Sequence, residues 1–492
     1  MADSVVETQY GRVRGVEENG VSVWRGIPFA RAPLGAYRFK PPQPPDPWTD
    51  VQDAREFGPG CLQIDARPIL AFASVPPSRQ SEDCLTLNIW APALDGKPRP
   101  VLVWIYGGSF VMGGGSLPVY DGRALALDGN MVMVTFNYRL GPFGFLYLDD
   151  LGNPSFQGSG NVGLLDQVAA LEWVRDNIAQ FGGDPTRVTV AGESAGAISV
   201  SNLLTMPRAR NLFHQAILQS GAGLMGSLPP AARIPARATL LQRLGIPGND
   251  VHRLQSIPAK DVFEASKGLP WVPVLDGAAL DMPMWTALEN GRAAGVRVLT
   301  GFNRHEYRYF MEPAWQALDD EAMRRQYEAT LAGPAPPQAA SHYLSGKSGV
   351  GLYDALAQLG TDKLFLASTY RFAALQSRHA PVWVYRFDWE STACEGLLKA
   401  CHAMEIPFVF NTLEAPGIAS FTGTSADRGE VARQMHHAWI AFIAAGTPET
   451  PAVPPWPSYS ADRRAVLAIN RTSRILHDPD ADALHLWDEI YG

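Results

Sequence analysis

Uninterrupted runs of apolar residues recur along the chain and predict the strands of a sheet. Residues 101–106 (VLVWIY) and 131–136 (MVMVTF) are apolar almost throughout, as are strands of a parallel sheet that is covered on both faces. Further strand-like runs lie at residues 21–29, 85–90, 188–191, 215–220, 296–301 and 381–387. These runs predict a large central sheet.

The segment from residue 161 to residue 181 has the period of a helix. Its apolar residues fall on one stripe, and they are Leu164, Leu165, Val168, Leu171, Val174, Ile178 and Phe181. Residues 182–185 (GGDP) end this helix, and the next strand follows at once. A strand, a crossover helix and a strand in this order form a parallel βαβ unit. We therefore predict an α/β fold with a central, mostly parallel sheet flanked by helices.

Two long segments between the later strands, residues 224–275 and 310–375, combine helical and loop patterns. In an α/β sheet such insertions lie over the carboxyl ends of the strands, where ligands bind. We expect them to form a lid or the walls of a pocket. Because the sequence shows no internal repeat and no change of composition that marks a second domain, residues 1–492 are interpreted as one domain.

Composition and charge exclude several classes of protein. Hydrophobic residues make up 46% and charged residues 18% of the 492 residues, which is ordinary for a globular protein with a large core. The net charge of −8, without a cluster of Lys and Arg, argues against binding to nucleic acid. The first residues lack the pattern of a secretory signal, and no apolar run is long enough to span a bilayer. Unless a signal has been removed, the sequence predicts a cytoplasmic protein.

The four cysteines are too few for a disulfide scaffold. Cys61 and Cys84 could close the segment between them into a loop, whereas a reducing cytosol would keep them as thiols. Cys394 and Cys401 lie close together in the sequence. Neither pair has the spacing of a metal site with histidines, and no metal or cofactor is predicted.

Residues 188–196 (VTVAGESAG) carry the strongest chemical signal. They are typical of a strand, a tight turn and the start of a helix. In the pattern G-x-S-x-G the glycines remove side chains that would collide at the turn, and the strained turn exposes the serine at the end of its strand. The N-terminus of the helix favours a developing negative charge there. Ser194 is therefore the predicted nucleophile, with a merely structural turn as the alternative.

A serine hydroxyl needs an imidazole to take its proton and a carboxylate to orient that imidazole. When the serine lies on such a turn, the acid follows it in the sequence and the histidine comes last. His402 stands out among ten histidines because it follows the strand at 381–387 by a short loop. Two acids qualify, Glu306 after the strand at 296–301 and Asp388 at the end of the next strand. We favour Glu306, because the strand before Asp388 is the one that leads to His402.

The tetrahedral intermediate of acyl transfer also needs N–H donors for its oxyanion. One comes from the residue after the nucleophile, Ala195, and others come from a loop after an early strand. Gly108 and Ser109 lie directly after the strand at 101–106, and their small size leaves the backbone N–H groups unobstructed. The alternative is a flexible Gly-rich turn, since no Lys-Ser or Lys-Thr follows to make it a phosphate loop.

Taken together, these residues resemble the type-B carboxylesterase family, large α/β-hydrolases that include the cholinesterases and the bacterial para-nitrobenzyl-esterase-like enzymes. The likeness covers nearly the whole chain. It rests on RGIPFA (25–30), SEDCLTLNIW (81–90), FNYR (136–139), NVGLLDQ (161–167), GESAG (192–196) and CHAMEIPFVF (401–410). The resemblance implies the α/β-hydrolase fold, a nucleophile at Ser194, an acid at Glu306, a base at His402, and oxyanion donors at Gly108, Ser109 and Ala195.

The resemblance also implies structural roles for other residues. It suggests two buried ion pairs, Arg38 with Glu82 and Arg139 with Asp166, and it aligns Cys61 and Cys84 with a bridge of secreted relatives. The chain departs from the family where Ser109 ends the oxyanion loop and where Glu306 lies between His305 and Tyr307 instead of Asp and Gly. Residues 61–84 contain no Trp, unlike the corresponding loop of cholinesterases, so a choline-ester specialist is disfavoured.

The sequence therefore predicts a serine carboxylic-ester hydrolase that cleaves small to medium apolar or aromatic esters through an acyl-enzyme. Phe110, Leu269, Pro270 and Trp271 are expected to contribute to the substrate pocket. The alternatives are an aryl carbamate or anilide hydrolase that uses the same residues, and a non-catalytic binding module. The expected partner is a small-molecule ester, with the protein a monomer or a weak homo-oligomer.

Overall fold

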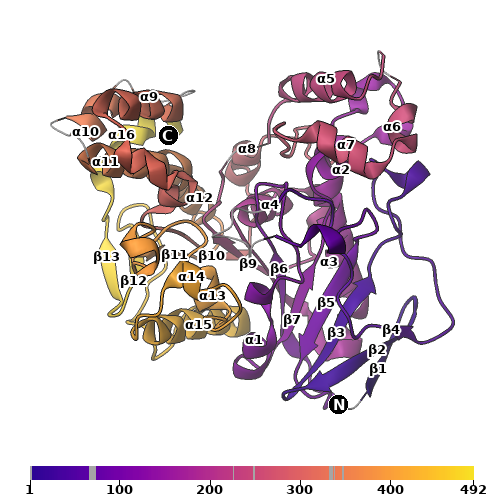
Figure 1. The fold of residues 1–492 in the computed structure, drawn as a ribbon. Helices are drawn as coiled ribbons and strands as arrows, with labels where there is room; N and C mark the ends of the chain where they lie inside the picture. Colours follow the sequence, from indigo (N-terminus) through magenta and orange to yellow (C-terminus); the bar gives the residue numbers. More distant parts are fainter. Residues whose placement is uncertain are drawn as a thin grey trace.

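Strands from the whole length of the chain pair into one sheet (Figure 1). The computed structural model describes residues 3–65, 74–224, 227–247, 250–331, 336, 338–345, 348 and 350–491. In spatial order the strands are β1 (Asp3–Thr8), β2 (Gly11–Glu18), β3 (Val21–Pro28), β5 (Thr86–Ala91), β7 (Val132–Phe136), β6 (Arg99–Ile105), β8 (Gly183–Glu193), β9 (Gln215–Gln219), β10 (Arg297–Asn303), β11 (Val382–Phe387), β12 (Ala465–Ile469) and β13 (Arg474–His477), with the short β4 (Gln52–Asp53) beside β2.

The middle of the sheet is parallel, as the apolar runs predicted. The strands from β7 to β12 in this order all pair in parallel, and the antiparallel pairs lie toward the two edges. Every residue of β6 and β7 is buried, which confirms the expectation of strands covered on both faces. One boundary was wrong: β8 already begins at Gly183, because Gly183 pairs with Arg99 of β6 before a bulge in the register.

Helices flank the sheet and close its core. The elements between the strands are α1 (Arg123–Asp128), α2 (Gly141–Phe145), α3 (Val162–Asn177), α4 (Ala195–Leu203), α8 (Met284–Glu289), α12 (Ala367–Gln376), α13 (Ile406–Val409), α14 (Ala419–Thr422) and α15 (Arg428–Ala445). The predicted helix at 161–181 is α3 followed by a 3-10 turn, η8 (Ile178–Phe181). Helix α15 packs on the last parallel strands, where the ring of Trp439 meets that of Tyr385 at 5.0 Å.

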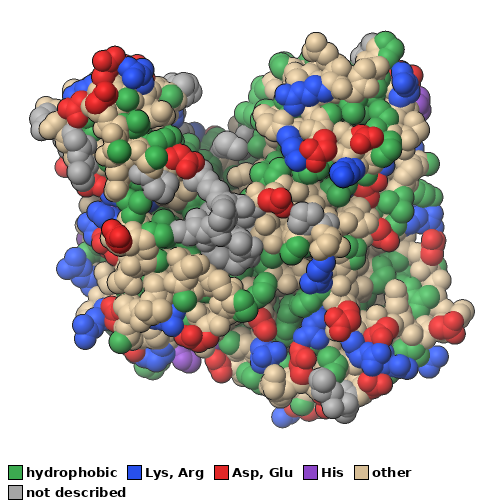
Figure 2. Space-filling view, viewed as in Figure 1, with side chains coloured by type: hydrophobic (Ala, Val, Ile, Leu, Met, Phe, Trp, Pro, Cys, Tyr) green, Lys and Arg blue, Asp and Glu red, His purple; other side chains and the backbone are tan. Residues whose placement is uncertain are grey.

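The two predicted insertions form separate groups of helices on the same side of the molecule. The first contains α5 (Ile234–Arg243), α6 (His252–Ser256) and α7 (Ala259–Ser266), and the second contains α9 (Asp320–Leu331), α10 (Ala339–Leu344) and α11 (Val350–Thr361) beside the C-terminal helix α16 (Ala481–Tyr491) (Figure 1). Figure 2 shows a hollow between these two groups and charges of both signs interspersed over this face. Residues 225–226, 248–249, 332–335, 337, 346–347 and 349 of the insertions lie outside the described residues.

The second insertion packs around a hydrophobic cluster of its own. Its members include Tyr327, Tyr343, Tyr353 and Leu356, and Trp487 of α16 packs into the same cluster. The main core lies around the sheet and is a separate cluster. The helical run from α11 through α12 therefore connects the second cluster to the sheet.

Several polar and covalent links hold the loops at the carboxyl edge of the sheet. Arg38 makes a two-pronged ion pair with Glu82 at 2.6 and 2.7 Å, and its other nitrogen donates to the carbonyls of Leu254 and Ile257. Arg139 pairs in the same way with Asp166, and both side chains are almost fully buried. Both pairs are thus structural.

A disulfide joins Cys61 to Cys84, whereas Cys394 is free and exposed and Cys401 is free and buried. Within the described part of the chain, no helix is both long and apolar enough to cross a bilayer.

Candidate active site

Ser194 lies at a strained turn between β8 and α4. Its backbone has φ 54° and ψ −122°, a conformation that costs an L-residue free energy and is found at functional turns. The flanking glycines make the turn sterically possible, since a side-chain carbon on Gly196 would lie 2.0 Å from the carbonyl oxygen of Ile105. Ser194 is partly exposed between two buried neighbours, Glu193 and Ala195. The sequence thus places one hydroxyl at the carboxyl end of a central strand, as predicted from the G-x-S-x-G pattern.

His402 and Glu306 form a buried pair. His402 Nδ1 lies 2.6 Å from Glu306 Oε2, and the side chains are 4% and 0% exposed. The other oxygen of Glu306 accepts the backbone N–H of Asn303 at 2.7 Å, and the backbone N–H of His402 donates to the Glu306 carbonyl at 3.3 Å. Glu306 is the first residue of a 3-10 turn, η11 (Glu306–Phe310), which follows β10. These contacts fix the imidazole with Nδ1 toward the acid.

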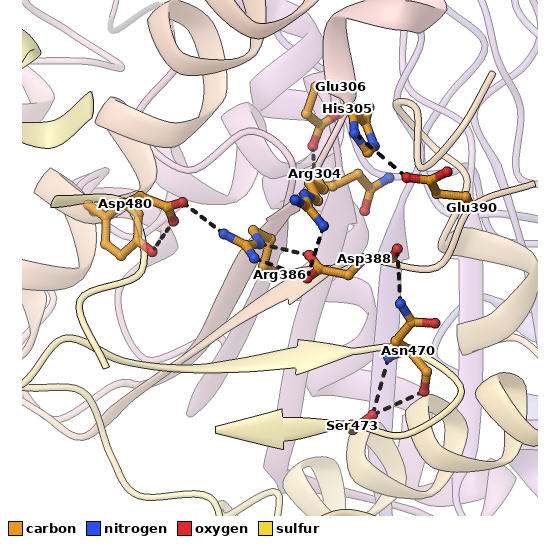
Figure 3. Close-up of polar contacts among 11 residues, drawn as sticks. Arg304, His305, Glu306, Arg386, Asp388, Glu390, Asn470, Ser473 and Asp480 are labelled. Atoms are coloured by element: carbon orange, nitrogen blue, oxygen red, sulfur yellow. Dashed lines mark hydrogen bonds and ion pairs between the residues drawn. The ribbon is translucent and has the colours of Figure 1, made fainter. Parts of the chain in front are cut away.

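The rival acid, Asp388, has a different partner. Its carboxylate accepts two bonds from Arg386, at 2.7 and 3.0 Å, and Arg304 lies 4.0 Å away. Arg386 in turn donates to Asp480 at 2.8 Å. Figure 3 shows Asp388 turned toward these arginines, with Glu306 beyond Arg304. The geometry therefore favours Glu306 as the partner of His402.

Glu193 is the nearest carboxylate to the second nitrogen of His402. Its Oε1 lies 3.1 Å from His402 Nε2. Burial raises the pKa of Glu193 to about 8, although the charge of His402 opposes this rise. Burial alone would lower the pKa of His402, but Glu193, Glu306 and Glu405 raise it to about 9. Glu193 and His402 therefore titrate as an interacting pair above neutral pH.

The loop after β6 lies against the turn that carries Ser194. A side-chain carbon on Gly107 would lie 2.7 Å from the Glu193 carbonyl oxygen and 3.0 Å from the Ser194 Cβ. Gly108 and Ser109 have φ values of 110° and 54°, which direct this stretch of backbone along the cavity wall. Ala195 is the first residue of α4, where N–H groups have no acceptor within the helix. The three predicted oxyanion donors thus meet around Ser194.

A cavity of about 110 Å³ brings these groups together. Its polar wall contains Ser194, His402 and Glu193, beside Gly107, Gly108 and Ser109. The remaining lining residues are mostly apolar: Met112, Val119, Tyr120, Tyr309, Phe310, Ala403 and Ile406. A partly exposed hydroxyl, a buried imidazole–carboxylate pair and a set of backbone donors in one cavity can carry out nucleophilic attack on a carbonyl.

The pocket residues predicted from the sequence do not line this cavity. Phe110 has a φ of 61°, which turns its ring into the core, where it packs at 4.8 Å from Phe145. Trp271 is buried in the core, and Leu269 is partly buried against it. Among the described residues of the second insertion, only the first, Phe310, is a lining residue. Phe110 was expected at the entrance of the site, and the backbone turn that buries its ring could not be foreseen from the sequence.

Other residues of the site were missed. Glu405 accepts hydrogen bonds from Asn303 at 2.5 Å and from Gln219 at 3.0 Å, and Asn303 also donates to the Cys401 carbonyl at 2.7 Å. These bonds connect the ends of β9 and β10 to the loop that carries His402. Glu193 lies inside the GESAG motif and Glu405 three residues after His402, so proximity in sequence was the only available signal.

Three aromatic rings surround the imidazole of His402. The ring centroids of Tyr309, Phe310 and Phe365 lie 5.4, 5.2 and 5.0 Å from it. Tyr309 and Phe310 belong to the turn that begins with Glu306. Within the described residues, no group of three or more His, Cys, Asp or Glu side chains is arranged to hold a metal ion.

Comparison with known proteins gives one consistent result. The sequence model of the carboxylesterase family matches residues 2–487. A para-nitrobenzyl esterase of Bacillus subtilis is 40% identical, over 98% of each chain, and a phenmedipham hydrolase of Pseudarthrobacter oxydans is 35% identical, over 97% of this chain and 98% of that one. The crystal structure of a carboxylesterase from Geobacillus stearothermophilus superposes with a TM-score of 0.89 and 41% identity, over 98% of this chain and 99% of that one.

Proposed function

The chain belongs to the carboxylesterase family and is a carboxylic-ester hydrolase of the α/β-hydrolase fold, and on this premise we propose that Ser194, His402 and Glu306 are its catalytic residues. The observation that carries this assignment is the buried His402–Glu306 pair, 2.6 Å apart, in the same cavity as Ser194. Ser194 is the nucleophile, His402 the general base and Glu306 the acid that orients the imidazole.

The reaction proceeds through an acyl-enzyme. His402 takes the proton of Ser194 as Ser194 Oγ attacks the ester carbonyl, and the protonated imidazole then gives this proton to the departing alkoxide. Water, activated by the same imidazole, attacks the acyl-enzyme and releases the carboxylic acid. The N–H groups of Gly108, Ser109 and Ala195 donate to the oxyanion of both tetrahedral intermediates.

The substrates are small to medium esters with apolar or aromatic groups. The cavity supports this proposal, because most of its wall is formed by Met112, Val119, Tyr309, Phe310 and similar side chains. Displacement of water from such a wall favours apolar groups by roughly 25 cal/mol per Å².

Three further assignments are part of the proposal. Residues 1–492 form one domain, in which the insertions at 224–275 and 310–375 border the access to the cavity. The protein acts in the cytoplasm as a monomer or a weak homo-oligomer. Gel filtration at two protein concentrations tests the oligomeric state. Thiol counting on rapidly quenched cells tests the compartment: a reducing cytoplasm would leave Cys61 and Cys84 as thiols, whereas retention of the disulfide seen in the structure would indicate an oxidising compartment.

A second activity uses the same residues. The similarity to a protein named phenmedipham hydrolase is consistent with cleavage of aryl carbamates or anilides. A carbamate would leave a carbamoyl group on Ser194, and hydrolysis of that group would limit turnover. A fast burst of phenol from an aryl carbamate followed by slow turnover, or release of aniline from an anilide, would favour this alternative.

Hydrolysis of p-nitrophenyl esters over a series of acyl lengths tests the main proposal. Ser194→Ala and His402→Ala should each lower kcat by about 10⁴ or more, whereas His437→Ala, which changes an exposed histidine of α15, should keep the parent rate. Comparison of Glu306→Gln with Asp388→Asn distinguishes the two candidate acids, because only Glu306→Gln should lower kcat severely.

Labelling with a fluorophosphonate completes the test. One label per chain on Ser194, and none in Ser194→Ala, is expected. Folded protein that neither hydrolyses any ester nor takes the label would instead indicate a binding module.

A further inference from the structure

Phe365 contacts the imidazole of His402 from behind the cavity. Its ring lies 5.0 Å from His402 and stacks at 6.2 Å on Phe310, with 2% of its surface exposed. Tyr309 and Phe310 line the cavity, and Phe365 is not among its lining residues. Phe365 thus contacts the proposed base but does not line the cavity in which the substrate would bind. It is also the one of the three rings that comes from a distant part of the chain.

The segment that carries Phe365 is a π-helical turn, η13 (Asp362–Leu366), between α11 and α12. In an α-helix, residues three apart lie on the same face. A π-turn has i→i+5 hydrogen bonds and includes one extra residue, so it changes the direction in which the following side chains point. Asp362 points into the cluster of the second insertion, while Phe365 points to His402. Such turns are frequent at functional sites.

Asp362 is held by neutral groups on both oxygens. Tyr343 of α10 donates its hydroxyl to Oδ2 at 2.7 Å, and Gln358 donates to Oδ1 at 2.7 Å. Trp487 of α16 donates its indole N–H to the same Tyr343 hydroxyl at 3.0 Å. Burial raises the pKa of Asp362 to about 7. The carboxyl group therefore connects the π-turn to two helices outside the main core.

The same helical run also contacts the turn that carries Glu306. The hydroxyl of Thr361 accepts the backbone N–H of Tyr307 at 3.2 Å. A side-chain carbon on Gly360 would lie 2.1 Å from the ring of Tyr307. The helix backbone therefore packs directly against this ring, and only glycine fits between them. One segment, residues 360–365, thus borders both members of the His402–Glu306 pair.

We propose that η13 is a positioning element for the His402–Glu306 pair, in which Phe365 is a positioning residue for the imidazole and Asp362 fixes the turn that presents it. This inference rests on the proposed function, in which His402 is the base. Glu306 at Nδ1 and Glu193 at Nε2 hold the two nitrogens of the ring, but neither fixes its tilt about the line between them. Phe365 restricts the tilt and keeps Nε2 directed to the side of the cavity where Ser194 lies.

Substitution of Phe365 separates positioning from other roles. Phe365→Ala should lower kcat, normalised to fluorophosphonate-titrated sites, about 10- to 100-fold, because a displaced base is costly to the rate. KM should stay within about twofold, because Phe365 does not border the substrate cavity. Phe365→Leu, which keeps an apolar side chain, should recover part of the loss and covers the case in which Phe365→Ala does not fold. The matched control is Phe442→Leu, a buried ring on α15 that packs on Trp383, which should keep the parent kcat.

The proton between His402 Nδ1 and Glu306 gives a readout independent of turnover. We expect a downfield proton resonance that disappears in His402→Ala, persists in Phe442→Leu, and broadens or shifts in Phe365→Ala. Asp362→Leu should change kcat and this resonance in the same direction as Phe365→Ala, whereas Asp362→Asn, which keeps an acceptor and the shape, should stay close to the parent.

Three results would overturn the inference. The first is a Phe365→Ala protein with the kcat, KM and resonance of the parent, and the second is a rise in KM at constant kcat, which would make Phe365 a substrate contact. The third is an Asp362→Leu protein that equals the parent in both readouts. If the parent itself hydrolyses no ester, the proposed function is wrong, and the resonance still decides whether Phe365 orders the His402–Glu306 pair.

Discussion

Replacement of Glu193 by Gln should move the pH dependence of ester hydrolysis to lower pH. The substitution removes a carboxylate whose oxygen lies 3.1 Å from His402 Nε2 and keeps the volume of the side chain. In the proposed mechanism only neutral imidazole can accept the proton of Ser194, so the acidic limb of kcat/KM should report the titration of His402 in the free enzyme. A carboxylate next to an imidazole favours its protonated form and moves this limb to higher pH.

The structure gives the size of the effect. Glu193, Glu306 and Glu405 raise the pKa of His402 from 6.5 to about 9 despite its burial, and this rise of about 2.5 corresponds to about 3 kcal/mol at 1.36 kcal/mol for each pH unit. Glu193 is the largest of the three charge effects. Its removal should therefore lower the limb by about one pH unit.

The assay is kcat/KM for a p-nitrophenyl ester from pH 5.5 to 10, corrected for spontaneous hydrolysis. In the parent, kcat/KM should rise with pH and the midpoint of this acidic limb should lie above pH 6.5. In Glu193→Gln the midpoint should lie about one pH unit lower. Glu172→Gln is the control, since Glu172 pairs with Arg208 at the surface. The same limb in Glu193→Gln and in the parent would refute the reasoning, because the charge 3.1 Å from the imidazole would then have no effect on its titration.

Three further predictions concern stability and the turn at Ser194. Asp166→Ala should lower the free energy of unfolding by about 3–5 kcal/mol, measured by urea denaturation, because it leaves the buried guanidinium of Arg139 without its partner; an unchanged midpoint would contradict this. Replacing both Cys61 and Cys84 by Ser should lower the free energy of unfolding by about 3 kcal/mol, because the disulfide closes a loop with a sequence separation of 23. A reductant should destabilise the parent but not this variant. Gly196→Ala should abolish fluorophosphonate labelling or soluble expression, because its Cβ would lie 2.0 Å from a backbone oxygen, and normal labelling would show that the turn can relax.

Local patterns were sufficient to predict the fold and several of the groups that meet in the cavity. Apolar runs indicated the central strands because such strands are buried on both faces, and β6 and β7 are buried at every residue. The G-x-S-x-G spacing indicated Ser194 because only small residues fit on either side of that turn. The choice of Glu306 over Asp388 needed topology, and the structure shows that Asp388 pairs with Arg386 instead.

The remaining features depend on contacts between distant parts of the chain. Phe110 and Trp271 are buried in the core because of backbone turns and packing that no local pattern encodes. The contact between Phe365 and His402 joins residues on two elements, and its direction depends on one extra residue in a helical turn. A single sequence gives the period of a helix but not the place where that period is broken.

The carboxylates around His402 show why distance along the chain is a poor guide to role. Glu306 meets Nδ1 and receives a backbone N–H on its other oxygen, so it stays an acceptor and fixes the ring. Glu193 meets Nε2, the nitrogen that must accept the proton of Ser194, and its raised pKa lets it become neutral without leaving the site. The imidazole therefore has one permanent partner and one exchangeable partner. In the proposed mechanism Nε2 must turn from Glu193 to Ser194, and the plane of the ring must then be held by groups other than the two acids. The rings of Tyr309, Phe310 and Phe365 are the groups placed to do so.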